Sequence, residues 1–236
     1  NKTSLKYKRS LEFPSNMKRD IQLLIFNSFI GNPSGLKLIV NQLGLMKGLR
    51  IVLKMQLNML LNNPFHSLNR TSDPLSWKER LSQKQILPAF ALYDALKSKG
   101  YAEDKAIEVV ETVVVGVAKK FLKYTVPVIH PKAINKTNQS GRKQFFTRIV
   151  DRFPNTFGAL NVERTDKGEA YHFTVNACLF ARYCKQLEYN NLASIFCRAD
   201  KAYFDNHQPL INFSRTETLA ADGKACDFKF DLIAKV

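Results

Sequence analysis

The pattern that decides the fold lies in residues 210–233, LINFSRTETLAADGKACDFKFDLI. Over residues 226–233, Cys, Phe, Phe and Leu alternate with Asp, Lys, Asp and Ile. A period of two places one set on the core face of a β-strand and the other toward water or a cleft. Asp and Gly in the segment 220–224 suit a tight turn. Residues 210–219 and 225–233 are therefore predicted to form an antiparallel hairpin.

A second hairpin is predicted upstream of this one. Residues 157–164 and 169–176 are short runs of mixed apolar and polar side chains, and they flank the turn sequence TDKG at 165–168. Asp and Gly again suit the turn. Residues 177–188 and 190–197 are predicted to form two short helices between the hairpins.

The amino-terminal half is predicted to be helical. Residues 33–63 are dense in Leu, Ile, Val and Met, and Gly44 and Gly48 should weaken this helix or admit a close backbone. Residues 64–78 have the composition of a loop.

Two long helices are predicted next, over residues 82–98 and 103–124. The second begins with acidic residues and ends with lysines, which suits the helix dipole. Its valine-rich run at 113–117 predicts deep burial. Residues 127–141 are predicted to be a long loop.

The chain is thus predicted to be one α+β domain over residues 1–236. Residues 1–150 are mainly helical, and 151–236 form an antiparallel α+β core of the kind that carries catalysis. The amino-terminal helical region is expected to pack with a carboxyl-terminal antiparallel sheet of two hairpins and inserted helices.

The charge is strongly basic, with a formal net charge of +16. Residues 1–70 hold eleven Lys and Arg against two acidic residues. Lys47, Arg50 and Lys54 share one helical face. Such a helix lies on an anionic membrane surface or packs its apolar stripe on the protein, and both alternatives stay open. No nucleic-acid-binding motif accompanies the charge, so no nucleic-acid partner is predicted.

The sequence predicts a cytoplasmic protein. No stretch of eighteen residues is both uncharged and strongly apolar, and the first residues do not resemble a signal peptide. The four cysteines fall in the last quarter of the chain without a CxxC pair, which favours reduced thiols over a disulfide framework. The oligomeric state is left open.

A recognisable pattern spans residues 173–230, FTVNACLFARYCKQLEYNNLASIFCRADKAYFDNHQPLINFSRTETLAADGKACDFKF. Its elements are a strand that ends in a cysteine, a helix, spaced Cys and Asp residues, an Arg–Thr pair, a glycine and a Cys-Asp-Phe tripeptide. In order, these are Cys178, Leu192, Cys197, Asp200, Arg215, Thr218, Gly223, Cys226, Asp227 and Phe228.

From Tyr171 to Ile233 the chain resembles the conserved core of the L-2-amino-thiazoline-4-carboxylic acid hydrolase family. The resemblance implies opening, or closing, of a small cyclic amidine ring, with water added at the carbon between sulfur and nitrogen. It implies a small-molecule substrate that bears a carboxylate. No cofactor is predicted.

The residue types in this segment suit such chemistry. Cys197 or Cys226 could attack an electron-poor amidine carbon. Asp200 and Asp227 could orient water or protonate a departing nitrogen. Substrate binding is assigned to a second set of side chains, which comprises Arg215 as a carboxylate clamp, Thr218, Cys178 and His172, with His172 or His207 as a candidate base.

Each assignment has a structural alternative. Cysteine often acts as a small buried hydrophobe, and the alternation around Cys226 fits a core position. Arg215 could simply pair with Asp227 or Glu217 across the hairpin. A non-catalytic ligand-binding module and a basic peripheral membrane or scaffold protein therefore remain as alternatives. The cysteines are spaced too widely for a typical structural zinc site, so no metal is predicted.

Overall fold

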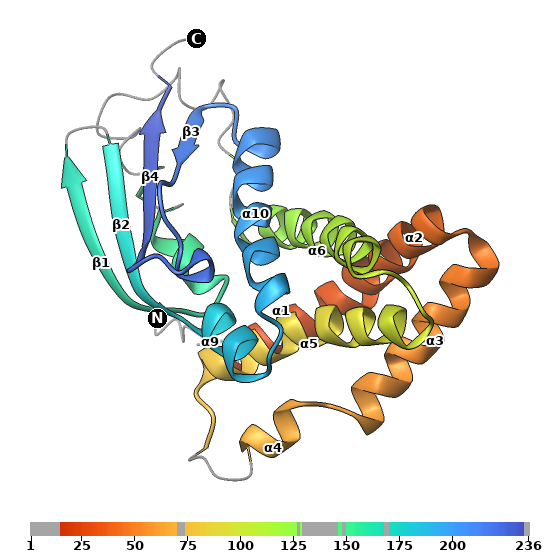
Figure 1. The fold of residues 1–236 in the computed structure, drawn as a ribbon. Coiled ribbons are helices and arrows are strands. Elements are labelled where there is room, and N and C mark those ends of the chain that lie inside the picture. Colours follow the sequence, from red (N-terminus) through yellow and green to blue (C-terminus); the bar gives the residue numbers. More distant parts are fainter. Residues whose placement is uncertain are drawn as a thin grey trace, which may run out of the picture.

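The computed structural model describes residues 15–69, 74–126, 128, 146–147, 150–167 and 170–233. Helices come first and the antiparallel sheet last, so the predicted α+β class is confirmed (Figure 1). The helices are α1 (Ser15–Phe26), α2 (Asn32–Leu43), α3 (Leu45–Leu61), α4 (Phe65–Asn69), α5 (Trp77–Ser98), α6 (Glu103–Thr125), α9 (Leu179–Gln186) and α10 (Asn190–His207), with short turns η1 (Asn27–Gly31), η2 (Phe153–Asn155) and η3 (Leu219–Ala221). The strands are β1 (Ala159–Lys167), β2 (Ala170–Cys178), β3 (Ile211–Ser214) and β4 (Cys226–Leu232).

Both predicted hairpins are present in one sheet of order β1-β2-β4-β3. The hairpins join because β2 pairs antiparallel with β4, which sets Phe173 opposite Phe228 and Val175 opposite Cys226. These four side chains are buried, while Lys229 is exposed. The alternation in β4 therefore puts Cys226 and the phenylalanines on the core face, as predicted.

Helix α10 connects two hydrophobic cores. Leu192 and Ile195, near its start, are buried among α5, α6 and α9. Tyr203 and Phe204, near its end, are buried against the aromatic face of the sheet. Figure 1 shows α10 between the sheet and the remaining helices. The middle of α10 consequently lies where the two cores meet.

Glycine divides the apolar segment that was predicted as one helix over 33–63. Gly44 adopts φ +79°, a conformation that favours glycine, and it separates α2 from α3. A Cβ on Gly48 would lie 2.9 Å from the backbone Cα of Val40, so Gly48 allows α2 and α3 to approach closely. Both expected roles of glycine occur, one at each position.

Several boundaries differ from the prediction. The segment 64–78 contains the short helix α4, and α10 continues to His207 because its second half buries Tyr203 and Phe204 against the sheet. The valine run 113–117 is half-buried rather than deeply buried, because several of these valines line a cavity. Most of the predicted loop at 127–141 lies outside the described residues.

One continuous helical stretch, Asp20–Leu43, is long and apolar enough to cross a membrane by length and composition, whereas no span was predicted from the sequence. Its mean hydropathy is 1.3, and 28% of its apolar window is buried. The stretch combines α1, η1 and α2, and α2 packs against α3 and α6. Core helices of soluble proteins meet the same criterion.

Candidate active site

The residues of the candidate site come from four places in the chain that the fold brings together. Cys178 ends β2 and precedes α9. Cys197 and Asp200 are three residues apart on α10 and therefore share a face. Arg215 directly follows β3, and Cys226 begins β4. These five side chains line one cavity of about 30 Å³.

The walls of this cavity are otherwise apolar. Its volume corresponds to about one water molecule. The remaining lining residues are Phe157, Phe180, Ala181, Ala193, Phe196, Ala220 and Phe228. The sequence did not indicate these wall residues as a set. The helical spacing of Ala193, Phe196 and Cys197, which puts them on the face of Asp200, is the signal that could have found part of the wall.

Arg215 and Asp200 form an ion pair inside this cavity. Arg215 Nη1 donates to Asp200 Oδ2 at 3.2 Å, and Nη2 donates to the backbone carbonyl of Cys197 at 2.8 Å. The two side chains are only 10% and 15% exposed. The guanidinium also lies 5.0 Å from the ring centroid of Phe228 and 5.7 Å from that of Phe213. Arg215 is therefore held between rings and a carboxylate, and these two hydrogen bonds use two of its five N–H donors.

Burial controls the protonation of Asp200. It raises the pKa of this carboxyl to about 6, although the positive charge of Arg215 and its hydrogen bond act in the opposite direction. A carboxyl of this kind gains and loses a proton near neutral pH, which general acid–base catalysis requires.

The three thiols of the cavity are neutral at physiological pH. Burial raises the pKa of Cys197 to about 12 and that of Cys178 to about 11, and it also raises the pKa of Cys226. The Cys226 Sγ accepts a hydrogen bond from the Leu219 backbone N–H at 3.2 Å, and Arg215 is close enough to favour its thiolate. Attack by any of these thiols would require a base to take the proton.

Three predicted site residues lie outside the cavity. Asp227 points from the other face of β4 and accepts hydrogen bonds from the backbone N–H groups of Thr216 and Glu217. Burial tends to raise its pKa, but these hydrogen bonds hold the pKa below its usual range. The Thr218 carbonyl accepts from Gly223 N–H in the turn. His172 pairs with Lys229 across the sheet, on the strand face opposite Phe173.

Other candidates also lie elsewhere. His207 ends α10, and neither described cavity includes it. Cys184 is completely buried in the core around α9, as a structural cysteine would be. All four cysteines are free thiols. Among the described residues, no group of three or more His, Cys, Asp or Glu side chains is placed to hold a metal ion.

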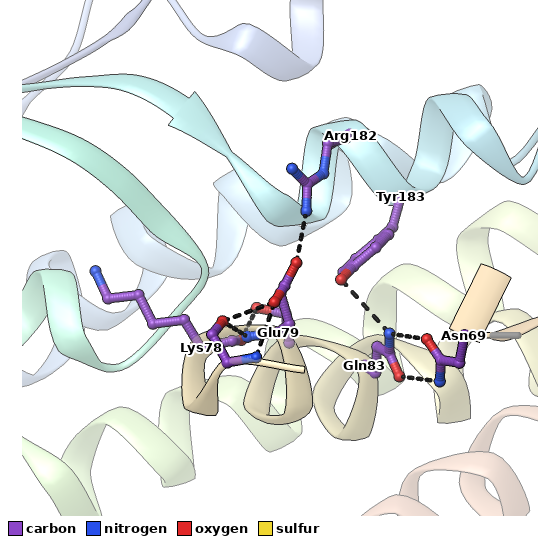
Figure 2. Close-up of polar contacts among 8 residues, drawn as sticks. Asn69, Lys78, Glu79, Gln83, Arg182 and Tyr183 are labelled. Carbon is purple, nitrogen blue, oxygen red and sulfur yellow. Dashed lines mark hydrogen bonds and ion pairs between the residues drawn. The ribbon is translucent and has the colours of Figure 1, made fainter. Parts of the chain in front are cut away.

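A second polar cluster fixes the helices beside the site (Figure 2). Ser76 and Glu79 form a capping box at the start of α5. Glu79 also accepts from Arg182 of α9 at 3.2 Å, and Arg182 points toward it in Figure 2. The hydrogen bond from the Ser76 backbone N–H lowers the pKa of Glu79. This cluster attaches α9, and with it the neighbouring Cys178, to α5.

A reciprocal amide pair extends the same cluster. Asn69 and Gln83 exchange hydrogen bonds of 3.1 and 3.0 Å, and Gln83 Nε2 reaches the Tyr183 hydroxyl at 3.5 Å (Figure 2). The contacts join α4, α5 and α9. Since each of these polar groups already has a protein partner, the cluster is a structural junction.

The sequence pattern of the L-2-amino-thiazoline-4-carboxylic acid hydrolase family matches residues 79–230. The chain belongs to this family. The match extends well upstream of the resemblance seen from Tyr171 onward, since it includes α5 from Glu79 and all of α6. Helices α1 to α4 lie outside the matched residues. Searches of curated proteins and of solved structures found no match.

The region that matches the thiazoline-carboxylate hydrolase family includes every residue that lines the candidate cavity. Phe157 is the first of its lining residues along the chain and Phe228 is the last, and both fall within 79–230. The family is named for a hydrolase of a small molecule.

Proposed function

We propose that this member of the family opens the ring of a small, carboxylate-bearing cyclic amidine by cysteine-dependent hydrolysis. The observation that carries the proposal is the convergence of Cys178, Cys197 and Cys226 around the Arg215–Asp200 pair in one cavity. The proposal requires this cavity to widen when a ring binds, because its volume of about 30 Å³ corresponds to about one water molecule. The family's hydrolase name supports the reaction class.

Arg215 is the proposed substrate anchor. Its guanidinium is fixed by Asp200 and by the Cys197 carbonyl, and it still has N–H donors to offer. A planar guanidinium binds a carboxylate through parallel hydrogen bonds. A bound carboxylate would also compete with Asp200 for Arg215, which would raise the affinity of Asp200 for a proton.

Cys226 is the proposed nucleophile and Asp200 the proposed base. The Cys226 Sγ already accepts one backbone hydrogen bond, which would favour the developing thiolate. As sulfur adds to the ring carbon between S and N, the thiol proton passes to Asp200. Asp200 then returns this proton to the ring heteroatom whose bond to that carbon breaks.

Water completes the reaction. It adds to the carbon that is bound to Cys226, and one of its protons goes to the nitrogen that is doubly bonded to that carbon. The bond from this carbon to Cys226 Sγ then breaks as the carbonyl forms, the second proton of the water returns to Sγ through Asp200, and the opened product leaves. The net change is the addition of one water molecule, with no oxidation or reduction.

Purified protein with L-2-amino-thiazoline-4-carboxylate and mass-spectrometric detection of the product tests the proposal. We expect Cys226→Ala and Asp200→Asn each to lower kcat by about a hundredfold or more. Cys184→Ala is the matched control, because Cys184 is buried outside the cavity. If Cys226→Ala kept full activity while Asp200→Asn lost it, the first nucleophile would be water or another cavity thiol, and Cys197→Ala would distinguish these two. Full activity in both variants would refute this site.

A second proposed function is attachment to an anionic membrane surface through α3. Its outward side carries an apolar stripe that includes Met46, Leu53 and Leu60, which are 65%, 65% and 73% exposed. Lys47 and Arg50 are also exposed. Exposed apolar surface flanked by cations is typical of helices that lie at lipid headgroups.

Co-sedimentation with vesicles tests this attachment. We expect binding to vesicles that contain phosphatidylserine, weaker binding at high salt, and loss of binding in Leu53→Gln. Val162→Gln is the control, because Val162 is an exposed apolar residue on the sheet. Absence of binding at low salt would refute the attachment. Self-association abolished by Leu53→Gln would instead identify a second copy of the chain as the partner.

A further inference from the structure

A large apolar cavity adjoins the candidate active site. Its volume is about 210 Å³, against about 30 Å³ for the cavity at Arg215. The two cavities share Phe157, Phe180, Phe196 and Asp200 as lining residues. The larger space therefore lies directly beside Asp200, the residue that the proposed reaction uses as a base.

Most of the walls of this apolar cavity come from α1, α2, α3, α5, α6 and α10, and η1 and α9 also contribute. Phe26, Ile39, Leu92, Val117 and Phe121 are among them. Protein interiors are normally packed with few voids larger than a water molecule. An engineered apolar cavity of roughly 150 Å³ binds benzene. The present cavity thus has room for an apolar group larger than a benzene ring.

One buried polar atom belongs to the same wall. Gln85 Nε2 donates to the Thr156 carbonyl at 2.9 Å, which orients the amide. Its Oε1 is buried and has no hydrogen-bond partner among the described residues. Buried polar atoms nearly always have such a partner. A ligand that donates one hydrogen bond from within its apolar part would supply it.

The cavity also reaches the protein surface. Leu36 of α2, which is 40% exposed, and the exposed Gln56 of α3 are among its lining residues. The lining of the cavity therefore includes solvent-exposed residues of α2 and α3, away from the sheet. These helices precede residue 79, so the part of the chain that matches the family does not determine this end of the cavity.

We infer that the natural ligand is amphipathic, with its polar head at Arg215 and Asp200 and an apolar substituent larger than a benzene ring in the adjoining cavity. The assignment of the head to a cyclic amidine carboxylate rests on the proposed function. The apolar part is assigned from the cavity itself. The substrate is accordingly larger and more apolar than an unsubstituted thiazoline carboxylate.

Binding of straight-chain carboxylates tests the inference without any catalytic step. Isothermal titration calorimetry of the full chain with alkanoates from butanoate to dodecanoate is expected to give one site. Its affinity should rise up to about fourfold for each added methylene until the cavity is filled.

Gly35→Leu is the variant that fills the cavity. Gly35 lies on the cavity wall, and a Cβ there meets only valine methyl groups at 3.8 and 3.9 Å. We expect Gly35→Leu to weaken binding of the longest alkanoates by at least about tenfold while butanoate binding stays unchanged, since the lost contacts correspond to several methylenes. Gly35→Ala, which adds one methyl group, is the matched control.

The outcomes separate this inference from the proposed reaction. Affinity that does not depend on chain length, or that Gly35→Leu leaves unchanged, overturns the inference. Rapid hydrolysis of the unsubstituted thiazoline carboxylate, with no effect of chain length on alkanoate binding, would support the proposed reaction and refute the inferred apolar substituent. A chain-length effect without ring opening would refute the reaction alone.

Discussion

At the scale of single residues, the site depends on two charges that are kept from water. Burying a charge is unfavourable unless a partner compensates for it, and Arg215 compensates only in part for Asp200. The carboxyl therefore retains a raised pKa of about 6. A site of this kind sacrifices some stability at neutral pH for a group that can exchange a proton.

The raised pKa of Asp200 makes the stability of the folded protein decrease as pH rises. In the folded protein the pKa of Asp200 is about 6, against about 4 in an unfolded chain, so protonation favours the folded state. The stabilisation that protonated Asp200 gives the folded state is fully present below about pH 4 and is lost as pH rises through 6. It amounts to about 3 kcal/mol.

Asp200→Asn removes this pH dependence, because asparagine does not titrate. In urea unfolding between pH 4 and pH 7, we expect the free energy of unfolding of the variant to rise relative to wild type by about 2 kcal/mol as pH increases, because part of the effect lies below pH 4. Asp205→Asn, which removes an exposed carboxylate from the same helix, controls for charge. Parallel curves for wild type and Asp200→Asn would contradict the assignment.

At the scale of elements, close approaches at glycine set the position of the thiols. Gly158 lies just before β1, and its carbonyl accepts from the Leu179 N–H at 2.8 Å. A Cβ at Gly158 would lie 2.5 Å from both Leu179 Cβ and Ser82 Oγ. Leu179 is the first residue of α9 and follows Cys178 directly, so Gly158 holds the start of α9 close to Ser82 of α5.

Two glycine variants are expected to change stability in opposite directions. Gly158→Ala should lower the free energy of unfolding by about 1–3 kcal/mol, because the Leu179 Cβ cannot rotate away. Gly35→Ala should raise it by up to about 1 kcal/mol, because alanine favours the helix and meets only ordinary contacts. Chemical denaturation measures both. A neutral Gly158→Ala would mean that β1 and α9 can separate freely.

At the scale of the whole molecule, α10 makes the helical part and the sheet depend on each other. Its first half lies in one core and its second half in the other. The cavity residues Cys197 and Asp200 lie between these halves. The prediction of a single domain over residues 1–236 requires that both cores unfold together.

Core variants at either end of α10 test this coupling. Leu192→Ala and Phe204→Ala each remove a completely buried side chain, which should cost about 2–5 kcal/mol. We expect hydrogen exchange in α6 and in β2 to accelerate together in both variants. If Phe204→Ala accelerated exchange only in the sheet, the two cores would be separate cooperative units.

The sequence by itself determined both hairpins and the two long central helices of this protein, whereas α4, the division between α2 and α3 and the second half of α10 were not predicted. Alternation in β4 and the turn glycines predicted both hairpins, and the helix signals predicted α5 and α6, because these features depend on neighbours along the chain. The sequence pattern around Cys197, Asp200 and Arg215 also predicted the family and the polar and sulfur-bearing residues that line the cavity, but not its apolar walls.

Only the tertiary structure decided which predicted residues meet. Asp227 and Cys226 are adjacent, yet the strand directs them to opposite faces, and only Cys226 reaches Arg215. The pairing of β2 with β4 and the position of α10 bring residues 178, 200 and 215 together. The apolar cavity likewise arises between helices far apart in the sequence. Local patterns cannot specify such contacts, because they depend on how separately formed elements pack.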